Sequence, residues 1–366
     1  MAKSVILLFE DNDEIVVSLR KAIKPHLKTD MAFEVFPLRD KPATDEGAFE
    51  DRLVKELKKR KDFANIALIV TDRDLSTAVK YWRGLSEAAV SRAAKVHGIP
   101  VACYRLAKDE IEDRLRRVAG DGLIELPANH ADRARSIAVL ARGFKHLQTL
   151  VQKENPANKK GNAQSEPTMS PGALLAKILG QPIIAPKLDT YACRDETAIA
   201  EILRASGDNA NLTQTIKTRL VVALGVWLAD LIMVYPGVLL NEKAAASYLD
   251  IDPTVFKRAV VRKVFQSAQY KSVLPFADSE APMWWRHLLD DVVTDADCET
   301  GLQVCQKKKL QKLKFCPCSV DKTLHAGFYC MATFEPLSAE NSSGRVSWFP
   351  PGADLARLSK RTYQKL

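Results

Sequence analysis

Residues 4–11 read SVILLFED, a short apolar run that ends in two carboxylates. A run of this length predicts a strand buried on both faces of a sheet. Similar runs recur through the first 150 residues and predict strands at residues 4–9, 32–37, 66–71, 99–104 and 123–126. Short apolar strands that alternate with helical segments are typical of a parallel sheet covered by helices on both faces.

The segments between these strands carry apolar residues at helical spacing. They predict helices at residues 15–23, 48–57, 86–97, 108–118 and 131–150. The fold class predicted for residues 1–150 is therefore α/β, a doubly wound parallel sheet of (βα)5 type.

Composition limits the class of protein. The chain has 366 residues, of which 46% are hydrophobic and 27% charged, and its formal net charge is +9. These values are ordinary for a soluble globular protein and exclude collagen, wholesale disorder and a small disulfide scaffold. The N-terminal apolar run is too short, and too soon followed by acids, for a signal peptide. Together with seven cysteines, which fit a reducing compartment, this predicts a cytoplasmic protein.

The most apolar segment, residues 220–240, has the length of a membrane span. Asp230 near its middle would cost a few kcal/mol in a bilayer. We therefore expect a buried core helix, and no membrane partner. The helix should end near Tyr235, because Pro236 cannot continue it.

The rest of the chain divides by composition. Residues 151–171 are polar, contain proline and lack an apolar period, and they predict a flexible linker. Residues 172–297 are mostly helical in pattern. Residues 298–366 alternate short apolar runs with turns and predict a small β-rich or mixed lobe.

Carboxylates follow two strands of the predicted sheet. Glu10 and Asp11 follow the first strand, and Asp72, with Asp74 two residues on, follows the third. In a sheet of strand order 2-1-3-4-5, the ends of these two strands are neighbours at the switch point, where ligands bind. Gathered carboxylates need a neutralising charge, and Mg²⁺ is the natural choice. With the metal bound, one carboxylate can act as a nucleophile toward a phosphoryl group.

The segments VILLFEDNDEI, ALIVTDRDL, GIPVACYRLA and GLIELP resemble the receiver domain of two-component response regulators over about residues 1–145. The resemblance implies that Glu10 and Asp11 are the acid pair that binds Mg²⁺, together with Asp72. It also implies that Asp72 is the phosphoacceptor, and that a sensor histidine kinase or another signalling protein is the partner.

Two positions depart from the family pattern. Arg105 stands where the family has Ser or Thr after strand four, and Leu126 replaces the Lys that precedes Pro127. Arg105 can pair with Asp72 and mimic part of a phosphorylated charge arrangement, so Arg105 and Pro127 are the candidate switch or pseudo-switch residues. The alternatives are a site that accepts a phosphoryl group, a pseudo-receiver that docks a protein, and an unrelated α/β domain whose acids only cap helices and solvate loops.

The middle of the chain contains a possible helix-turn-helix. Residues 241–249 predict a short helix capped by Asn241, and Pro253 begins a second helix over residues 254–265 with Asp252 as its cap. The candidate nucleic-acid contacts on this second helix are Lys257, Arg258 and Arg262. The alternative is a pair of packed helices whose basic residues are merely solvated.

Two other features suggest binding surfaces. Trp284 and Trp285 predict an interaction surface, a base-stacking platform or a seal between domains. The segment 306–314, QKKKLQKLK, includes Lys307, Lys308 and Lys309 as candidate contacts to DNA or RNA phosphates or to an acidic partner. Its other interpretation is the solvated face of a short helix or hairpin.

Cysteines gather near the C-terminus. Cys305, Cys316, Cys318 and Cys330 are candidate Zn²⁺ ligands, with His325 as a substitute for Cys305. The paired spacing of a zinc knuckle is absent, so the alternative is that these cysteines are small buried hydrophobes.

We expect an atypical response-regulator-like signalling protein. Its receiver-like domain accepts a phosphoryl group or docks a partner and controls a C-terminal region that binds nucleic acid or protein. One alternative is an adaptor with a phosphorylation-independent pseudo-receiver and no nucleic-acid contact, in a bacterial conflict or defence system. Another is an output enzyme of an unrecognised family, although the sequence carries no evident catalytic triad or P-loop.

Overall fold

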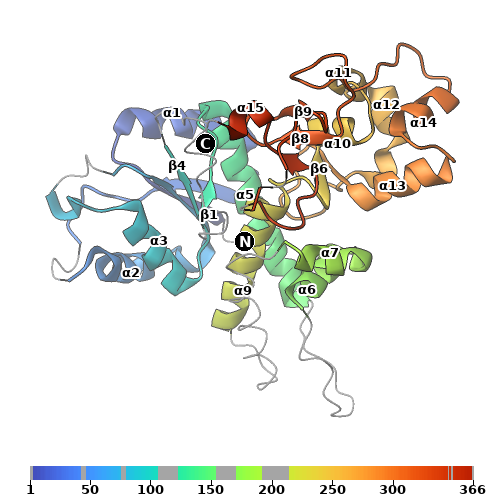
Figure 1. The fold of residues 1–366 in the computed structure, drawn as a ribbon. Coiled ribbons are helices and arrows are strands. Elements are labelled where there is room, and N and C mark those ends of the chain that lie inside the picture. Colours follow the sequence, from blue (N-terminus) through green and yellow to red (C-terminus); the bar gives the residue numbers. More distant parts are fainter. Residues whose placement is uncertain are drawn as a thin grey trace, which may run out of the picture. The chain divides into compact units, whose positions relative to one another are not determined.

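The computed structural model describes residues 3–42, 47–75, 80–105, 123–153, 170–191, 214–344, 346–347 and 349–364. These residues belong to two compact units (Figure 1). The first unit draws on residues 1–109, 120–169 and 194–230, and the second on residues 110–119, 170–193 and 231–366. The helix predicted at residues 108–118 and most of the linker predicted at 151–171 lie outside the described residues.

The first unit is built on a five-stranded parallel sheet with the order β2-β1-β3-β4-β5. Its strands are β1 (Ser4–Phe9), β2 (Met31–Val35), β3 (Ile66–Asp72), β4 (Val101–Tyr104) and β5 (Ile124–Glu125). This is the parallel α/β sheet that the sequence predicts.

Helices of the first unit cover the sheet. They are α1 (Asp13–Ile23), α2 (Phe49–Lys59), α3 (Glu87–His97) and α5 (His130–Lys153), while α9 (Gln214–Val226) packs against α5. Short 3-10 turns lie at Lys24–His26, Phe63–Asn65 and Lys80–Trp82. Alternate strand residues such as Leu7 and Ile69 share one buried cluster with residues of α2 and α3, while α5 packs against α1 and β3. Figure 1 shows the sheet among these helices.

Polar caps fix where the helices beside the sheet begin. The Asn12 side chain accepts a hydrogen bond from the backbone N–H of Glu14 and starts α1 directly after the acids of β1. Ser86 caps α3 in the same way, and Gly98 ends it in the left-handed conformation with φ 64°.

The second unit combines short helices with two small sheets. The sheets are an antiparallel pair of β6 (Leu239–Asn241) and β7 (Met283–Trp285), and the set β10 (Ala356–Arg357), β8 (Phe328–Cys330) and β9 (Glu335–Leu337). The helices are α6 (Pro171–Ile178), α7 (Ala185–Asp189), α10 (Glu242–Tyr248), α11 (Pro253–Phe256), α12 (Ala259–Val264), α13 (Arg286–Asp295), α14 (Gly301–Lys307) and α15 (Lys360–Tyr363), with 3-10 turns at Pro182–Ile184 and Gln266–Ala268.

The apolar segment 220–240 is divided between helix and strand. α9 ends at Val226, a π-helical stretch covers Trp227–Ile232, and β6 begins at Leu239. Trp227, Leu228 and Ile232 are almost fully buried, as expected for a core segment. None of the described helices has both the length and the apolar character that crossing a membrane requires.

Candidate functional site

The structure brings the three predicted carboxylates together at one edge of the first sheet. Glu10 and Asp11 directly follow β1, and Asp72 is the last residue of β3. The register pairs Phe9 with Thr71, which places these strand ends side by side. Glu10 is 4% exposed and Asp72 is 3% exposed, so these two acids are buried, whereas Asp11 is half-buried.

Burial and mutual repulsion set the charge of this pocket. Burial raises the pKa of Glu10, and the neighbouring carboxylates of Asp72 and Asp11 raise it further. Burial likewise raises the pKa of Asp72, although the backbone N–H of Asp74 donates to its Oδ1 at 3.1 Å and acts in the opposite direction. The ionised carboxylates therefore need internal hydrogen bonds and a compensating charge.

Tyr104 supplies one of those hydrogen bonds. It is the last residue of β4 and the register partner of Asp72. Its hydroxyl donates to Oε2 of Glu10, while the backbone N–H of Asn12 donates to Oε1 at 2.9 Å. Both carboxylate oxygens of Glu10 are thus engaged within the protein. Burial, the Glu10 charge and this hydrogen bond together raise the pKa of Tyr104.

Arg133, in the first turn of α5, supplies the compensating charge. It is fully buried, and its guanidinium lies 4.2 Å from the centroid of the Tyr104 ring. Burial lowers its pKa, whereas Tyr104, Asp72 and Glu10 act in the opposite direction. The same guanidinium donates to the carbonyl oxygens of Pro127, Ala128 and Arg105, at 3.0, 2.8 and 3.3 Å. These three hydrogen bonds fix its position.

The two predicted switch residues, Arg105 and Pro127, contact Arg133 through their backbone carbonyls. The Arg105 side chain is exposed, and no ion pair joins it to Asp72 among the described residues. Because β4 ends at Tyr104, it is Tyr104 rather than Arg105 that stands opposite Asp72. The expected pairing of Arg105 with Asp72 is therefore not formed, and the cation beside the acids is Arg133. Pro127 contributes the carbonyl that accepts from Nε of Arg133.

A cavity of about 350 Å³ opens beside Glu10 and Asp11, between α1 and the segment that follows β2. Apolar residues such as Val16 and Phe36 line it together with Arg20 and Arg39. Oδ2 of Asp11 is buried and has no hydrogen-bond partner within the described part of the chain.

Binding of Mg²⁺ by the acid pocket stays a prediction. This ion needs several free oxygen ligands in near-octahedral geometry. Each Glu10 oxygen accepts one hydrogen bond, from the Tyr104 hydroxyl or from the Asn12 N–H, and keeps a second lone pair. Across the residues that the structure describes, no group of three or more His, Cys, Asp or Glu side chains is close enough to hold a metal ion.

Tyr104 and Arg133 were not singled out from the sequence. Arg133 did leave a signal, because it lies on the buried face of α5 with Ile137 and Phe144. A charged residue on the apolar face of a helix is rarely buried without a partner.

The predicted helix-turn-helix is only partly correct. Asn241 caps α10 through the Ala244 N–H, and Asp252 caps α11, as predicted. The expected continuous helix over residues 254–265 is wrong, because the chain forms two short helices, α11 and α12, separated at residues 257–258. Arg258 is extended there, with φ −66° and ψ 133°, and its Nη1 donates to the carbonyls of Gln311 and Lys312 at 2.8 and 3.3 Å.

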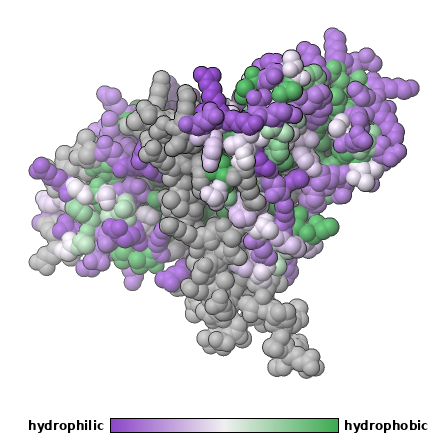
Figure 2. Space-filling view, in the orientation of Figure 1, coloured by the Kyte–Doolittle hydropathy of each residue, from purple (hydrophilic) through white to green (hydrophobic). Residues whose placement is uncertain are grey.

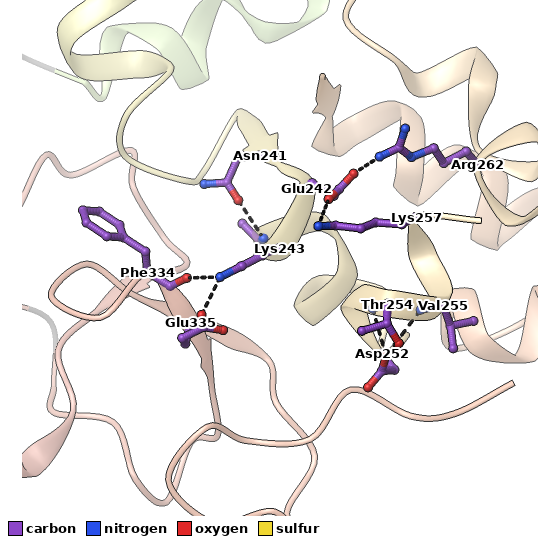
Figure 3. A network of polar contacts seen from close by, with 11 residues as sticks. Asn241, Glu242, Lys243, Asp252, Thr254, Val255, Lys257, Arg262, Phe334 and Glu335 are labelled. Atoms are coloured by element: carbon purple, nitrogen blue, oxygen red, sulfur yellow. Dashed lines mark hydrogen bonds and ion pairs between the residues drawn. The ribbon is translucent and has the colours of Figure 1, made fainter. Parts of the chain in front are cut away.

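This break changes which residues face the core. Val261 is fully buried, whereas Val260 is 52% exposed. Lys257 and Arg262 both form ion pairs with Glu242, the first at 3.3 Å (Figure 3). The basic residues therefore lie on a loop and a short helix rather than along one recognition helix.

The other candidate phosphate contacts lie at the end of α14 and directly after it. All three are exposed, namely Lys307, Lys308 and Lys309.

The tryptophan pair belongs to the core of the second unit. Trp284 and Trp285 are each 1% exposed and lie in β7. Trp284 packs edge-on against Phe256 with ring centroids 5.0 Å apart, and Trp285 contacts Tyr270 at 5.2 Å. The expected roles as an exposed interaction surface or stacking platform are wrong, because neither ring is accessible.

The candidate zinc ligands Cys305, Cys316, Cys318 and Cys330 are buried free thiols. Burial raises the pKa of Cys305 to about 11 and that of Cys316 to about 12. Burial acts in the same sense on Cys318, but hydrogen bonds from Asp321 and Ser338 outweigh it and lower the pKa of that thiol. Nδ1 of His325 lies 2.9 Å from Oδ2 of Asp250, a contact that leaves the role of Nε2 undecided, so zinc binding stays a prediction. These contacts match the interpretation of the cysteines as buried small side chains.

Comparison with known proteins adds no relative: no family model, no curated protein and no solved structure matches this chain.

Proposed function

We propose that the first unit is an atypical receiver-like signalling domain that docks a partner protein without phosphoryl transfer. In this proposal it controls an interaction region in the second unit. The parallel sheet with its acids at the ends of β1 and β3 supports the receiver-like part of the proposal, because these positions follow the resemblance noted in the sequence.

The hydrogen bond from Tyr104 to Glu10 carries the proposal. With the Asn12 N–H on its other oxygen, each Glu10 oxygen already accepts a hydrogen bond from within the protein. Asp72 is 3% exposed, whereas a phosphodonor must reach its carboxylate. The internal hydrogen bonds to Glu10 and Asp72 favour a fixed conformation over a phosphorylation cycle.

Arg133 supports the same conclusion. In the receiver family, a mobile lysine contacts the phosphoryl group, and that lysine is missing here. The cation present instead is held by the carbonyls of Pro127, Ala128 and Arg105. A cation fixed in this way cannot report a group that arrives and departs, so signalling depends on binding partners rather than on Asp72 chemistry.

A second candidate function is phosphoryl acceptance by Asp72, with a sensor histidine kinase as the donor. The buried, unpartnered Oδ2 of Asp11 and the cavity beside it favour this candidate. Asp11 and Asp72 would then supply ligands for Mg²⁺, which neutralises the charge of a phosphoryl group.

Intact-mass measurement after incubation with acetyl phosphate and Mg²⁺ separates the two candidates. The docking proposal predicts that the full chain gains no phosphoryl adduct and behaves like Asp72→Asn. An established receiver protein in the same tube confirms that the donor is active. An adduct on the wild type that Asp72→Asn lacks would refute docking without phosphotransfer and support the second candidate.

A further inference from the structure

We propose that the second unit binds the phosphate backbone of duplex DNA through residues 254–263 and 306–314, here called the basic surface, and that Glu242 partly neutralises it. This inference rests on the output part of the proposed function and is independent of the acid pocket.

The basic surface is dense in cations. Residues 254–263 contain two lysines and two arginines, residues 306–314 contain five lysines, and neither segment contains an acid. The lysines of both segments are all exposed, namely Lys257, Lys263, Lys307, Lys308, Lys309, Lys312 and Lys314. Figure 2 shows hydrophilic side chains over much of the part of the molecule that holds α12 and α14.

Hydrogen bonds hold the two segments side by side. Besides the two bonds from Arg258 to Gln311 and Lys312, the backbone N–H of Asp252 donates to the carbonyl of Lys314 at 3.0 Å. Lys309 and Lys312 adopt left-handed backbone conformations with φ 57° and 55°, which are uncommon for residues other than glycine. Arg258 is thus a positioning residue that keeps this lysine-rich turn beside α11 and α12.

Glu242 already occupies part of the surface. This residue begins α10, and its carboxylate forms ion pairs with both Lys257 and Arg262 (Figure 3). It is the only acidic side chain that pairs with either segment within the described chain. The Glu242 carboxylate occupies the position between Lys257 and Arg262 at which a phosphate would bind both cations. Glu242 therefore competes with an anionic ligand for these two side chains.

The composition of the surface favours duplex nucleic acid over an acidic protein. Protein interfaces are depleted in lysine and depend on buried aromatic or arginine anchors. Here the nearby aromatic rings of Phe256, Phe265 and Trp284 are buried. They cannot serve as anchors, nor as platforms for the unstacked bases of a single strand. Exposed lysines contact phosphates irrespective of base sequence. Of the ligands considered, the phosphate backbone of a duplex therefore fits this surface best.

Salt-dependent binding of a labelled DNA duplex to the full chain tests the surface. The variant Lys308→Gln/Lys309→Gln/Lys312→Gln should bind on the order of 100-fold more weakly near physiological salt, with the slope of log K against log salt reduced by about 2.7. The matched control is Lys21→Gln/Lys55→Gln/Lys58→Gln, which changes net charge equally on exposed lysines of the first unit. It should stay within about 3-fold of the wild type, because these lysines contact no phosphate.

Glu242→Gln tests the competing carboxylate. It should tighten duplex binding and steepen the slope by up to about 2, because two cations become available. Lys257→Gln, whose partner is Glu242, should weaken binding less than Lys308→Gln does. Unchanged or weaker binding by a folded Glu242→Gln variant would refute the role of Glu242.

Equal losses in the two triple variants, or binding only to poly-glutamate or to single-stranded DNA, would overturn the basic surface. Failure here is distinct from failure of the receiver proposal. Asp72→Asn leaves the basic surface intact, and the acetyl phosphate experiment does not involve DNA.

Discussion

The hydroxyl of Tyr104 donates a hydrogen bond to Oε2 of Glu10, although the two residues lie 94 positions apart in the chain. Parallel pairing of β1 with β3 and of β3 with β4 brings them together, with Asp72 in register beside Tyr104. This contact turns an array of like charges into a closed pocket. It gives Glu10 a hydrogen-bond donor from within the protein, whereas Oδ2 of Asp11 has none among the described residues.

Tyr104→Phe tests the contact by removing one hydroxyl. The change leaves Oε2 of Glu10 buried without a donor, so we expect the first unit to lose about 1–3 kcal/mol of stability. Hydrogen exchange of the β1 and β3 amides measures the loss in the full chain. Tyr363→Phe, at a residue that is 54% exposed, should leave exchange unchanged. Equal protection in both variants would show that the contact adds nothing.

The raised pKa values of Glu10 and Asp72 predict how stability changes with pH. A carboxyl group whose pKa is raised by folding binds its proton more tightly in the folded state. The stability that each group contributes is fully present below its ordinary pKa, which is 4.5 for Glu10 and 3.8 for Asp72. This stability is lost as the pH rises through the raised pKa of the folded state. Asp72→Asn should therefore gain stability relative to the wild type as pH rises. Protection of β3 amides across a pH series measures the difference, and a gain toward acid pH would contradict the assignment.

Arg133 offers a graded test of the buried cation. Arg133→Met leaves three carbonyls without their donor and removes the counter-charge of the acids, and we expect a loss of about 3–5 kcal/mol. Arg133→Lys keeps the charge but lacks the planar fork, so about 1–3 kcal/mol should be lost. Arg83→Lys, on the surface, should change stability by less than about 0.5 kcal/mol. Equal stabilities for all three variants would rule out a role for the guanidinium in holding the pocket.

The cysteines of the second unit predict a pattern of thiol reactivity. Among the described cysteines only Cys298 is partly exposed, so it should react first with an aromatic disulfide reagent. Cys305, Cys316, Cys318 and Cys330 should react only after denaturation, with or without a chelator. Peptide mapping of the labelled chain identifies the modified thiols. Faster labelling of these four after chelation would instead support the zinc alternative.

Sequence patterns predicted the sheet well for a physical reason. Buried parallel strands are continuous apolar runs, and the acids at their ends mark where the runs stop. Tyr104 and Arg133 were not predicted as site residues, because their roles depend on strand register and on side-chain direction. A single sequence shows neither. Strand β4 ends at Tyr104, as predicted, and the register with β3 places Tyr104 rather than Arg105 opposite Asp72.

The second unit shows a different limit of prediction. Local caps such as Asn241 and Asp252 involve residues close in sequence, and they were predicted correctly. The break at Arg258 depends on carbonyls more than 50 residues away, and the burial of Trp284 depends on pairing with β6. Long-range contacts of this kind override local helical propensity.

A double-mutant cycle of Tyr104→Phe and Glu10→Met, the second of which removes both carboxylate oxygens, tests the pocket most directly. Amide protection of β1 in the two single variants, the double variant and the wild type gives the coupling energy between these side chains. The account predicts a coupling of about 1–3 kcal/mol, because each change removes the same buried hydrogen bond. Additive effects, with no coupling beyond about 0.3 kcal/mol, would contradict it.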